Sequence, residues 1–496
     1  MENVGYLKIV GVTHGKSEMR KTIEHINFKT AINSMQHNFN QWKIRILTDW
    51  GKVTTTKSHG LSQLQYMVNS IVTPTWAVKE AKKKIALFVW NGPDKITRNK
   101  ASKQWKDGGM NLPLLEEWQA AASVHWFRRM QEHPDRLWAK NMRISLEKVF
   151  GIGTRHPAQP DLDKIGHIYP HTLKLIENWL TLNDKPELTP QSPVWLNKLL
   201  QVLVGKKKKS TTLQCSRLSA LGYNRVADFF DHDGRLIQGR DAIRKGLPFL
   251  LQSEWQTVVR ALRSKKWNKH EIIQAKNQIY ETLQNKPFCV TIDGYTLEGT
   301  MVTQKRLLQQ CAKRREYISN KTQEKVTEVT GAEWADWERA FKSTTQHSIS
   351  TRSRAKLFRM YAGISYTNKA YHRFGHKDSA KCTYCHEEKQ DFTHLFLKCP
   401  GVELFRESLQ HDWQEELNTK EWFFGNENND LSYLIRESNI YLHMNNWKGK
   451  SLSKVQLYTY ICENEKIEAA IAEKRNRLGE HIEKWQGRFA LMQIQQ

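Results

Sequence analysis

Residues 78–92 read VKEAKKKIALFVWNG, and this stretch indicates the fold class of the first part of the chain. Its apolar side chains recur every three or four residues, as on one side of an α-helix. They are Val78, Ala81, Ile85 and Phe88. Lys82, Lys83 and Lys84 lie beside this stripe, so one surface of the helix packs while the other is basic. A turn signal follows at Asn91-Gly92-Pro93-Asp94.

The rest of the chain extends this mainly α-helical expectation, and 496 residues predict several domains rather than one core. Prolines concentrate and periodicity weakens after residue 145, and a short hairpin with Asp293-Gly294 at its tip interrupts a later helical region. We therefore expect five parts: helices over 1–145, a proline-rich linker with a lysine run over 146–210, a helical segment over 211–345, a basic and aromatic helix with a small knuckle rich in Cys and His over 346–410, and C-terminal helices over 411–496.

The charge balance points to a polyanionic partner. The chain has 77 Lys and Arg against 51 Asp and Glu, a formal charge of +26. Such a surplus repels itself unless a polyanion is close, so we expect RNA and DNA as partners; the alternative is a basic chain with no such partner. No signal-peptide core, basic amphipathic stretch or long apolar run supports a membrane partner, which predicts an intracellular protein of the nucleus or cytoplasm, or both.

Residues 382–400, CTYCHEEKQDFTHLFLKCP, carry the strongest local signal. The spacing is Cys382-x2-Cys385-x8-His394-x4-Cys399. Two thiolates two residues apart chelate one ion from a tight turn, and the more distant His and Cys complete a tetrahedral shell. Because all four ligands come from the protein, we expect one structural Zn ion with no open position for catalysis. A chance cluster, or ligation by His386 instead, remain the alternatives.

Basic residues outside the first 145 residues gather in two further places. Residues 352–373 mix cations with Phe358, Tyr361, Tyr366 and Tyr371, a composition that suits single-stranded or irregular nucleic acid, although half of these aromatic rings would equally serve a core. The cations are Arg352, Arg354, Lys356, Arg359 and Arg373. Lys206, Lys207, Lys208 and Lys209 form a run that is either a solvated loop or a phosphate-contacting loop or localisation signal.

The sequence offers no convincing catalytic motif. Residues 11–17, GVTHGKS, have three residues between the glycines, where a phosphate-binding loop requires four. Zinc-protease, serine-hydrolase and paired-carboxylate patterns are also missing. We therefore expect no catalytic residues.

The order of several short motifs is similar to that of a known family. They are Ile9-Val10-Gly11-Val12, Phe88-Val89-Trp90-Asn91-Gly92, Gly108-Gly109-Met110-Asn111-Leu112-Pro113, Asp228-Phe229-Phe230 with Asp233-Gly234, Thr367-Asn368, Arg373-Phe374-Gly375 and the Cys/His cluster. In this order the chain resembles the C-terminal part of the reverse transcriptase of LINE-type non-LTR retrotransposons. The resemblance covers nearly the whole chain.

The resemblance implies that residues 1–145 form the end of the polymerase palm and a helical thumb that grips RNA and DNA. It makes Lys82 to Lys84 candidate contacts of the nucleic-acid backbone, together with Lys95, Arg98, Lys100, Lys103 and Lys106. The family's palm holds Mg²⁺ on aspartates of an F/Y-A-D-D motif, which does not occur in this sequence, and the family's endonuclease is also missing. We therefore expect no catalytic Mg site. The chain would then be a noncatalytic, nucleic-acid-binding portion of such a reverse transcriptase. The alternatives are an accessory part that works with a palm in trans, and a zinc-stabilised protein-interaction scaffold.

Overall fold

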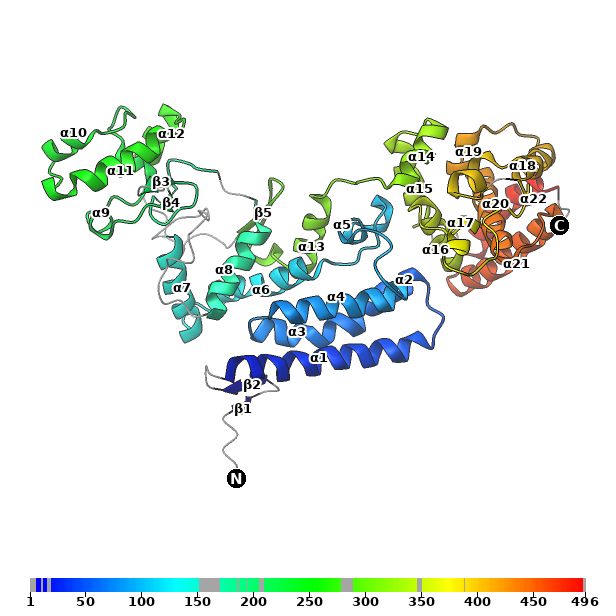
Figure 1. Ribbon diagram of the computed structural model, residues 1–496, viewed down its shortest axis with the longest axis horizontal. Coiled ribbons are helices and arrows are strands. Elements are labelled where there is room, and N and C mark those ends of the chain that lie inside the picture. Colours follow the sequence, from blue (N-terminus) through cyan, green and yellow to red (C-terminus); the bar gives the residue numbers. More distant parts are fainter. Residues whose placement is uncertain are drawn as a thin grey trace, which may run out of the picture. The chain divides into compact units, whose positions relative to one another are not determined.

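The computed structural model describes residues 6–9, 12–15, 19–150, 170–184, 187–192, 194–204, 209–277, 289–345, 350–387 and 389–493. Helices dominate these ranges, and the sheets within them are three two-stranded antiparallel hairpins (Figure 1). The chain divides into two compact units, and each unit gathers segments that are far apart in sequence. Unit 1 comprises residues 1–29, 65–78 and 115–314, and unit 2 comprises 30–64, 79–114 and 315–496. The expectation of a mainly α-helical chain with more than one compact part is confirmed.

Unit 1 is built around helix α6. Its strands and α-helices in chain order are β1 (Tyr6–Ile9), β2 (Val12–Gly15), parts of α1 (Arg20–Lys43), α3 (Leu61–Ser70) and α4 (Thr75–Trp90), then α6 (Leu115–Glu132), α7 (Leu137–Phe150), α8 (Pro170–Leu182), β3 (Gln201–Val204), β4 (Lys209–Thr212), α9 (Ser216–Ala220), α10 (Gly239–Arg244), α11 (Gln252–Arg263), α12 (Lys269–Asn277), β5 (Cys289–Ile292), β6 (Tyr295–Glu298) and α13 (Gln304–Lys313). Small residues on α6, Ala120 and Ala121, are fully buried where α8 packs against it.

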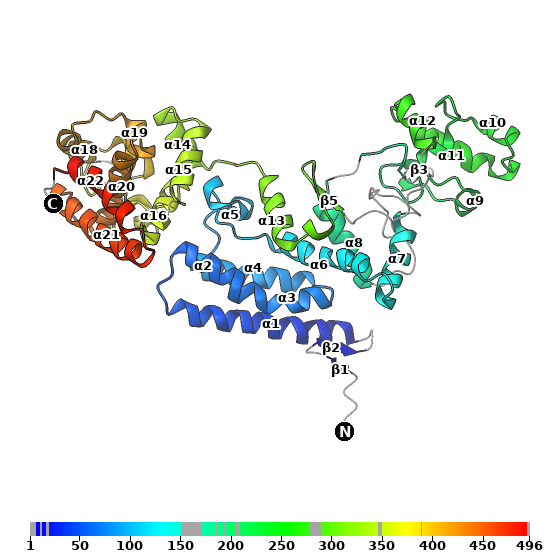
Figure 2. The ribbon, with the colours of Figure 1, turned by 180° about the vertical axis from the view of Figure 1, so that it is seen from behind.

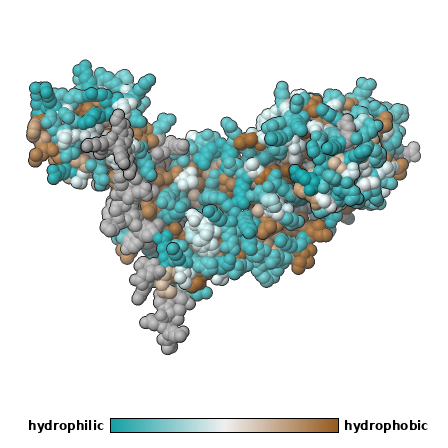
Figure 3. Space-filling view, viewed as in Figure 1, coloured by the Kyte–Doolittle hydropathy of each residue, from teal (hydrophilic) through white to brown (hydrophobic). Residues whose placement is uncertain are grey.

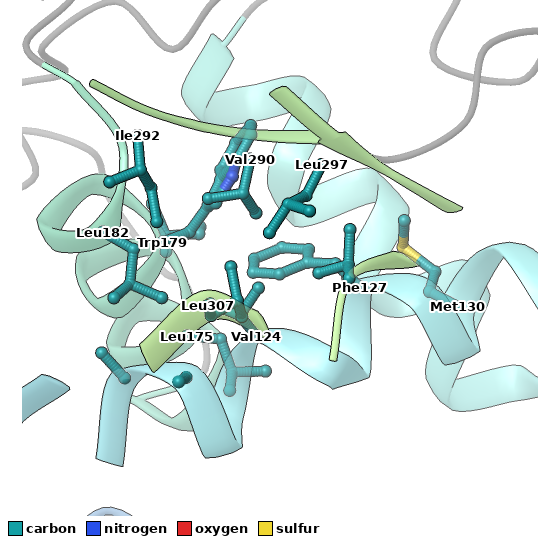
Figure 4. Packing of buried hydrophobic residues seen from close by; sticks show 14 of the residues in the cluster. Val124, Phe127, Met130, Leu175, Trp179, Leu182, Val290, Ile292, Leu297 and Leu307 are labelled. Carbon is teal, nitrogen blue, oxygen red and sulfur yellow. The ribbon is translucent and has the colours of Figure 1, made fainter. Parts of the chain in front are cut away.

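One apolar cluster joins α6, α8, α13 and the β5–β6 hairpin. Figure 4 shows the ring of Phe127 between Leu307 and the hairpin residues Val290 and Leu297, with Trp179 of α8 beside them. Helix α8 lies within the range expected to be a linker, and it nonetheless supplies part of this core. A second cluster surrounds Trp255 of α11.

The predicted hairpin is present with the predicted tip. Ile292 pairs with Tyr295, so Asp293 and Gly294 form a two-residue turn, with φ angles of 53° and 71°. Both residues take the left-handed conformation that a type I′ turn requires, which explains the Asp-Gly sequence. The Asp184 carboxylate accepts hydrogen bonds from the two turn N–H groups at 2.7 and 2.8 Å and fixes the hairpin to the end of α8.

Unit 2 contains the residues of the candidate site. Its elements are the remaining parts of α1, α3 and α4, then α2 (Asp49–Thr55), the π-helical turn η2 (Thr56–Gly60), α5 (Arg98–Ser102), the short turn η3 (Trp105–Asp107), α14 (Lys321–Thr330), α15 (Trp334–Ser343), α16 (Thr351–Tyr361), α17 (Asn368–Arg373), the π-helical turn η7 (His394–Lys398), α18 (Pro400–Trp413), α19 (Thr419–Phe424), α20 (Asn429–Lys448), α21 (Lys454–Lys474) and α22 (Leu478–Leu491).

Helix α20 is the centre of the C-terminal part of unit 2. Residues 431–442 are buried without interruption, because α16, α19, α21 and α22 all pack against this helix (Figure 2). Trp485 of α22 is buried there, whereas other large apolar residues of α21 and α22 are exposed. These exposed residues are Ile467, Ile471, Leu478 and Ile482.

Candidate metal centre and its surroundings

The four predicted ligands come together at one point. Cys382 and Cys385 lie in a tight turn closed by the backbone bridge between Lys381 and Lys389. His394 begins η7, and Cys399 immediately precedes Pro400, the first residue of α18. These two short elements explain why the second half of the motif has a fixed geometry: a helical turn presents the imidazole, and the start of a helix presents the last thiol.

The ligand atoms have the separations that one ion requires. All four lie within 4.8 Å of one another, with Cys382 Sγ 3.5 Å from Cys399 Sγ and Cys385 Sγ 3.4 Å from His394 Nε2. Ligands about 2.1 to 2.3 Å from a tetrahedral ion stand roughly 3.5 to 3.8 Å apart. Cys382, His394 and Cys399 are buried, and Cys385 is half-buried. The cluster can therefore hold one metal ion, and His386 is not part of it.

Hydrogen-bond donors surround the Cys382 sulfur. The Tyr384 backbone N–H lies 3.4 Å from it and the Gln390 amide lies 3.2 Å from it. The neighbouring Cys399 thiol, followed by these donors, holds the pKa of Cys382 below its usual value. A sulfur that already accepts hydrogen bonds as a thiolate is prepared to bind a cation.

Gln390 connects the cluster to the rest of unit 2. It is fully buried, and its amide also donates to Asn446 of α20 at 2.8 Å. Its carbonyl oxygen accepts from the backbone of Asn368 at 3.0 Å, and the Asn368 side chain donates to the Lys381 carbonyl and the Thr383 hydroxyl. This network could not be predicted from the sequence, because an amide inside a cysteine motif gives no spacing signal of its own.

Two predicted nucleic-acid contacts from distant parts of the sequence lie on adjoining aromatic rings. The Lys95 ammonium lies 4.8 Å from the Tyr366 ring centre, and the Arg373 guanidinium lies 4.8 Å from that of Phe374. The two rings meet edge to face with centres 5.5 Å apart. Phe374 is exposed. We call Lys95, Tyr366, Arg373 and Phe374 the aromatic-basic surface.

Four other predicted contacts are used inside unit 2. Lys100 and Lys103 are buried; Lys100 donates to Gln323 at 2.5 Å, and Lys103 donates to the Arg315 carbonyl. The remaining two lie on α16: Lys356 is half-buried against Met444, and Arg359 is paired with Asp49. Their cationic groups satisfy internal partners, so the structure does not present them as a shared surface for phosphates.

The other predicted contacts are dispersed. Lys83, Lys106 and Arg352 are exposed, Lys82 and Lys84 are half-buried on α4, Arg98 pairs with Asp94 at 2.6 Å, and Arg354 lies over the Trp50 ring. Lys206, Lys207 and Lys208 fall outside the described residues, and Lys209 is described only as the first residue of β4. The face shown in Figure 3 is largely hydrophilic, with apolar residues in small patches.

Comparisons with known proteins do not identify a family for this chain. No protein-family model matches the chain, and no curated protein matches it significantly. Within the described ranges, no helix has both the length and the apolar character needed to cross a membrane.

Proposed function

We propose that this chain binds RNA and DNA through the aromatic-basic surface, beside a metal centre that holds one structural Zn ion. The observation that carries the proposal is the convergence of Lys95 and Arg373 on the paired rings of Tyr366 and Phe374. Cations neutralise phosphates, and an exposed ring such as that of Phe374 can stack on bases whatever the sequence. The resemblance to the C-terminal part of a LINE-type reverse transcriptase supports the same function.

Zinc is the ion that suits this donor set best. Three thiolates and one imidazole form a closed tetrahedral shell, as in structural zinc sites, and leave no position for water or substrate. The ion supplies folding energy to the turn and η7 rather than chemistry. Since the ligand thiols must be reduced, we place the protein in the nucleus or cytoplasm.

The test is a binding titration of the full chain. We would measure affinity for a structured RNA and a matched duplex DNA at two salt concentrations, for wild type and for Arg373→Gln/Phe374→Ala. We expect affinity to fall steeply with salt and the double variant to bind at least about tenfold more weakly, because stacking contributes roughly 1–3 kcal/mol per base. Arg129→Gln is the matched control, since Arg129 also lies over a ring, that of Trp126, in unit 1.

Two results would overturn the proposal. One is affinity that does not change with salt; the other is a double variant that binds as well as Arg129→Gln. Primer extension by the chain alone would contradict the noncatalytic assignment, whereas extension only with a separately supplied palm would assign the chain an accessory role in polymerisation.

A protein-interaction scaffold is the second candidate. The exposed apolar residues Ile467, Ile471, Leu478 and Ile482 on α21 and α22 favour it. Binding of RNA no tighter than binding of a simple polyanion such as heparin would favour the scaffold over the nucleic-acid proposal.

A further inference from the structure

A cavity of about 220 Å³ lies in unit 2 among the start of α16, the end of α21 and the first half of α22. It is separate from the metal ligands and from the aromatic-basic surface. Most of its lining side chains are charged, and Ile471 and Ala472 add a small apolar part. The charged and titratable residues are Arg354, Arg475, Arg477, Lys484, Glu468, Glu480 and His481.

The arginines of this cavity have no carboxylate partner within ion-pair distance in the described part of the chain. Among the described residues, none of Arg354, Arg475 and Arg477 forms an ion pair, whereas the fourth cation, Lys484, is attracted by Glu468 and Asp430. The Arg354 guanidinium is held over the Trp50 ring, donates to Thr351 Oγ1 at 3.3 Å, and keeps its buried Nε without a hydrogen-bond partner. Burial, followed by the nearby positive charge of Arg475, lowers the pKa of Arg354. An anion bound beside both guanidinium groups would offset the repulsion between them.

The N-terminus of α16 adds positive charge to the cavity, whereas Glu468 reduces it. The N-terminus of α16, an 11-residue helix, carries partial positive charge at Thr351 in the cavity wall. Glu468 is only 7% exposed; one of its oxygens accepts from the Tyr433 hydroxyl at 3.3 Å, and the other forms an ion pair with the Arg488 guanidinium at 3.9 Å. His481 is already paired with Glu465 at 3.0 Å.

We propose that this cavity binds a phosphomonoester, held by Arg354, Arg475 and Arg477 at the N-terminus of α16. The charge of the lining supports a monoester over an internal phosphodiester. Four lining cations face two lining carboxylates, which leaves two positive charges, and one of the carboxylates, Glu468, is also paired with Arg488, which does not line the cavity. A phosphomonoester carries about −1.5 to −2 charges at neutral pH, whereas a diester carries one. Arginine guanidinium groups suit this ligand because they bind phosphate oxygens in pairs.

The same phosphomonoester chemistry occurs in a free nucleotide and at the 5′ end of a nucleic-acid strand. The inference goes beyond the proposed function, because the cavity requires neither the metal ion nor the aromatic-basic surface. It therefore survives or fails independently of the titrations described above.

The experiment measures binding of AMP, inorganic phosphate and two otherwise identical oligonucleotides, one with a 5′-phosphate and one with a 5′-hydroxyl, by calorimetry at fixed ionic strength. Arg475→Gln/Arg477→Gln removes two exposed lining cations. Lys466→Gln/Lys474→Gln is the matched control, because it removes the same charge from exposed positions of α21 that do not line the cavity. Glu480→Gln removes an exposed lining carboxylate.

We expect the arginine variant to bind AMP at least about tenfold more weakly, since it loses charge-assisted hydrogen bonds, and the lysine control to stay within about twofold of wild type. Glu480→Gln should bind more tightly than wild type, a result that a damaged fold does not produce. Tighter binding of the 5′-phosphorylated strand than of the 5′-hydroxyl strand identifies a strand end as the source, whereas equal binding of the two strands together with binding of AMP identifies a free nucleotide. No binding of either monoester, or equal weakening in the arginine and lysine variants, overturns the site.

Discussion

The Arg359 guanidinium donates two hydrogen bonds to the Asp49 carboxylate, at 2.6 and 2.7 Å, across 310 residues of sequence. Asp49 is the first residue of α2 and is almost fully buried. The next residue, Trp50, stacks on Trp105 at 3.9 Å, and Trp105 meets Phe358 of α16 edge to face. One ion pair and one aromatic stack thus join three segments of unit 2 that are distant in the chain.

Replacing Arg359 with Met should destabilise unit 2 substantially. The change leaves the Asp49 carboxylate buried without a cation, which should lower the free energy of unfolding by about 3 kcal/mol. This value is at the low end of the range for broken buried ion pairs, because the Arg359 side chain is partly exposed. Urea unfolding measures the difference. Arg352→Met, at an exposed position of the same helix, should stay within about 0.5 kcal/mol of wild type, and equal losses in the two variants would contradict the structural role of the pair.

Metal removal should unfold the turn around Cys382 and η7. Metal analysis of the purified chain should give one ion per molecule, and Cys382→Ser or a chelator should lower both the metal content and the melting temperature. Cys462→Ser is the control, because Cys462 is a half-buried free thiol in α21 outside the cluster. A metal-free chain that melts at the same temperature as the loaded one would refute a stabilising ion.

Gly109 should tolerate no side chain. A Cβ atom at this position would lie 2.1 Å from the Lys103 carbonyl oxygen, a backbone atom that cannot rotate away. Gly109→Ala should therefore destabilise the chain by more than about 2 kcal/mol, as expected for a forced backbone shift. Gly92→Ala should be nearly neutral, since nothing lies within 4 Å of a Cβ there. Thermal unfolding of the two variants makes the comparison, and similar melting temperatures would refute this packing.

Lys100 should make stability depend on pH. Burial lowers the pKa of Lys100 from 10.5 to about 7, so between these values the unfolded chain binds a proton that the folded chain does not. Burying the charged form of Lys100 lowers the free energy of unfolding. This destabilisation is at its full value below about pH 7 and disappears as the pH rises toward 10.5. Relative to Lys100→Met, the wild type should therefore gain stability with rising pH.

The slope of that gain should approach about 1.4 kcal/mol per pH unit between about pH 8 and 9.5, measured by urea unfolding of both proteins at several pH values. Lys106→Met, at an exposed position in η3, is the control and should parallel the wild type. Parallel curves for wild type and Lys100→Met would show that Lys100 remains charged in the folded chain.

The sequence predicted best what depends on local spacing. The helical periodicity, the Asp293-Gly294 turn and the Cys/His cluster each follow from residues close together in the chain, and the structure has all three. The metal identity and the resemblance to a reverse transcriptase stay predictions. The five-part division of the chain also stays a prediction.

The sequence could not show which cations are internal. Lys100 and Lys103 belong to the same basic series as Lys95 and Lys106, yet their burial depends on residues 315 to 323, more than 200 positions away. The partners of Gln390 in α17 and α20 are non-local in the same way. The C-terminal helices show the same limit: Trp485 packs against Tyr433 of α20, whereas the equally apolar Ile467 and Ile471 are exposed.

Segments of the two units alternate along the chain, so unit 2 cannot be completed until most of unit 1 has been synthesised. Residues 30–64 and 79–114 belong to a unit whose remaining part starts at residue 315, and the 200 residues from Leu115 to Arg314 are made in between. At about 5–20 residues per second, the ribosome needs roughly 10 to 40 seconds to make that insertion. During this interval Asp49 and Lys100 have left the ribosome without Arg359 and Gln323, so the nascent chain exposes surfaces that chaperones would have to shield.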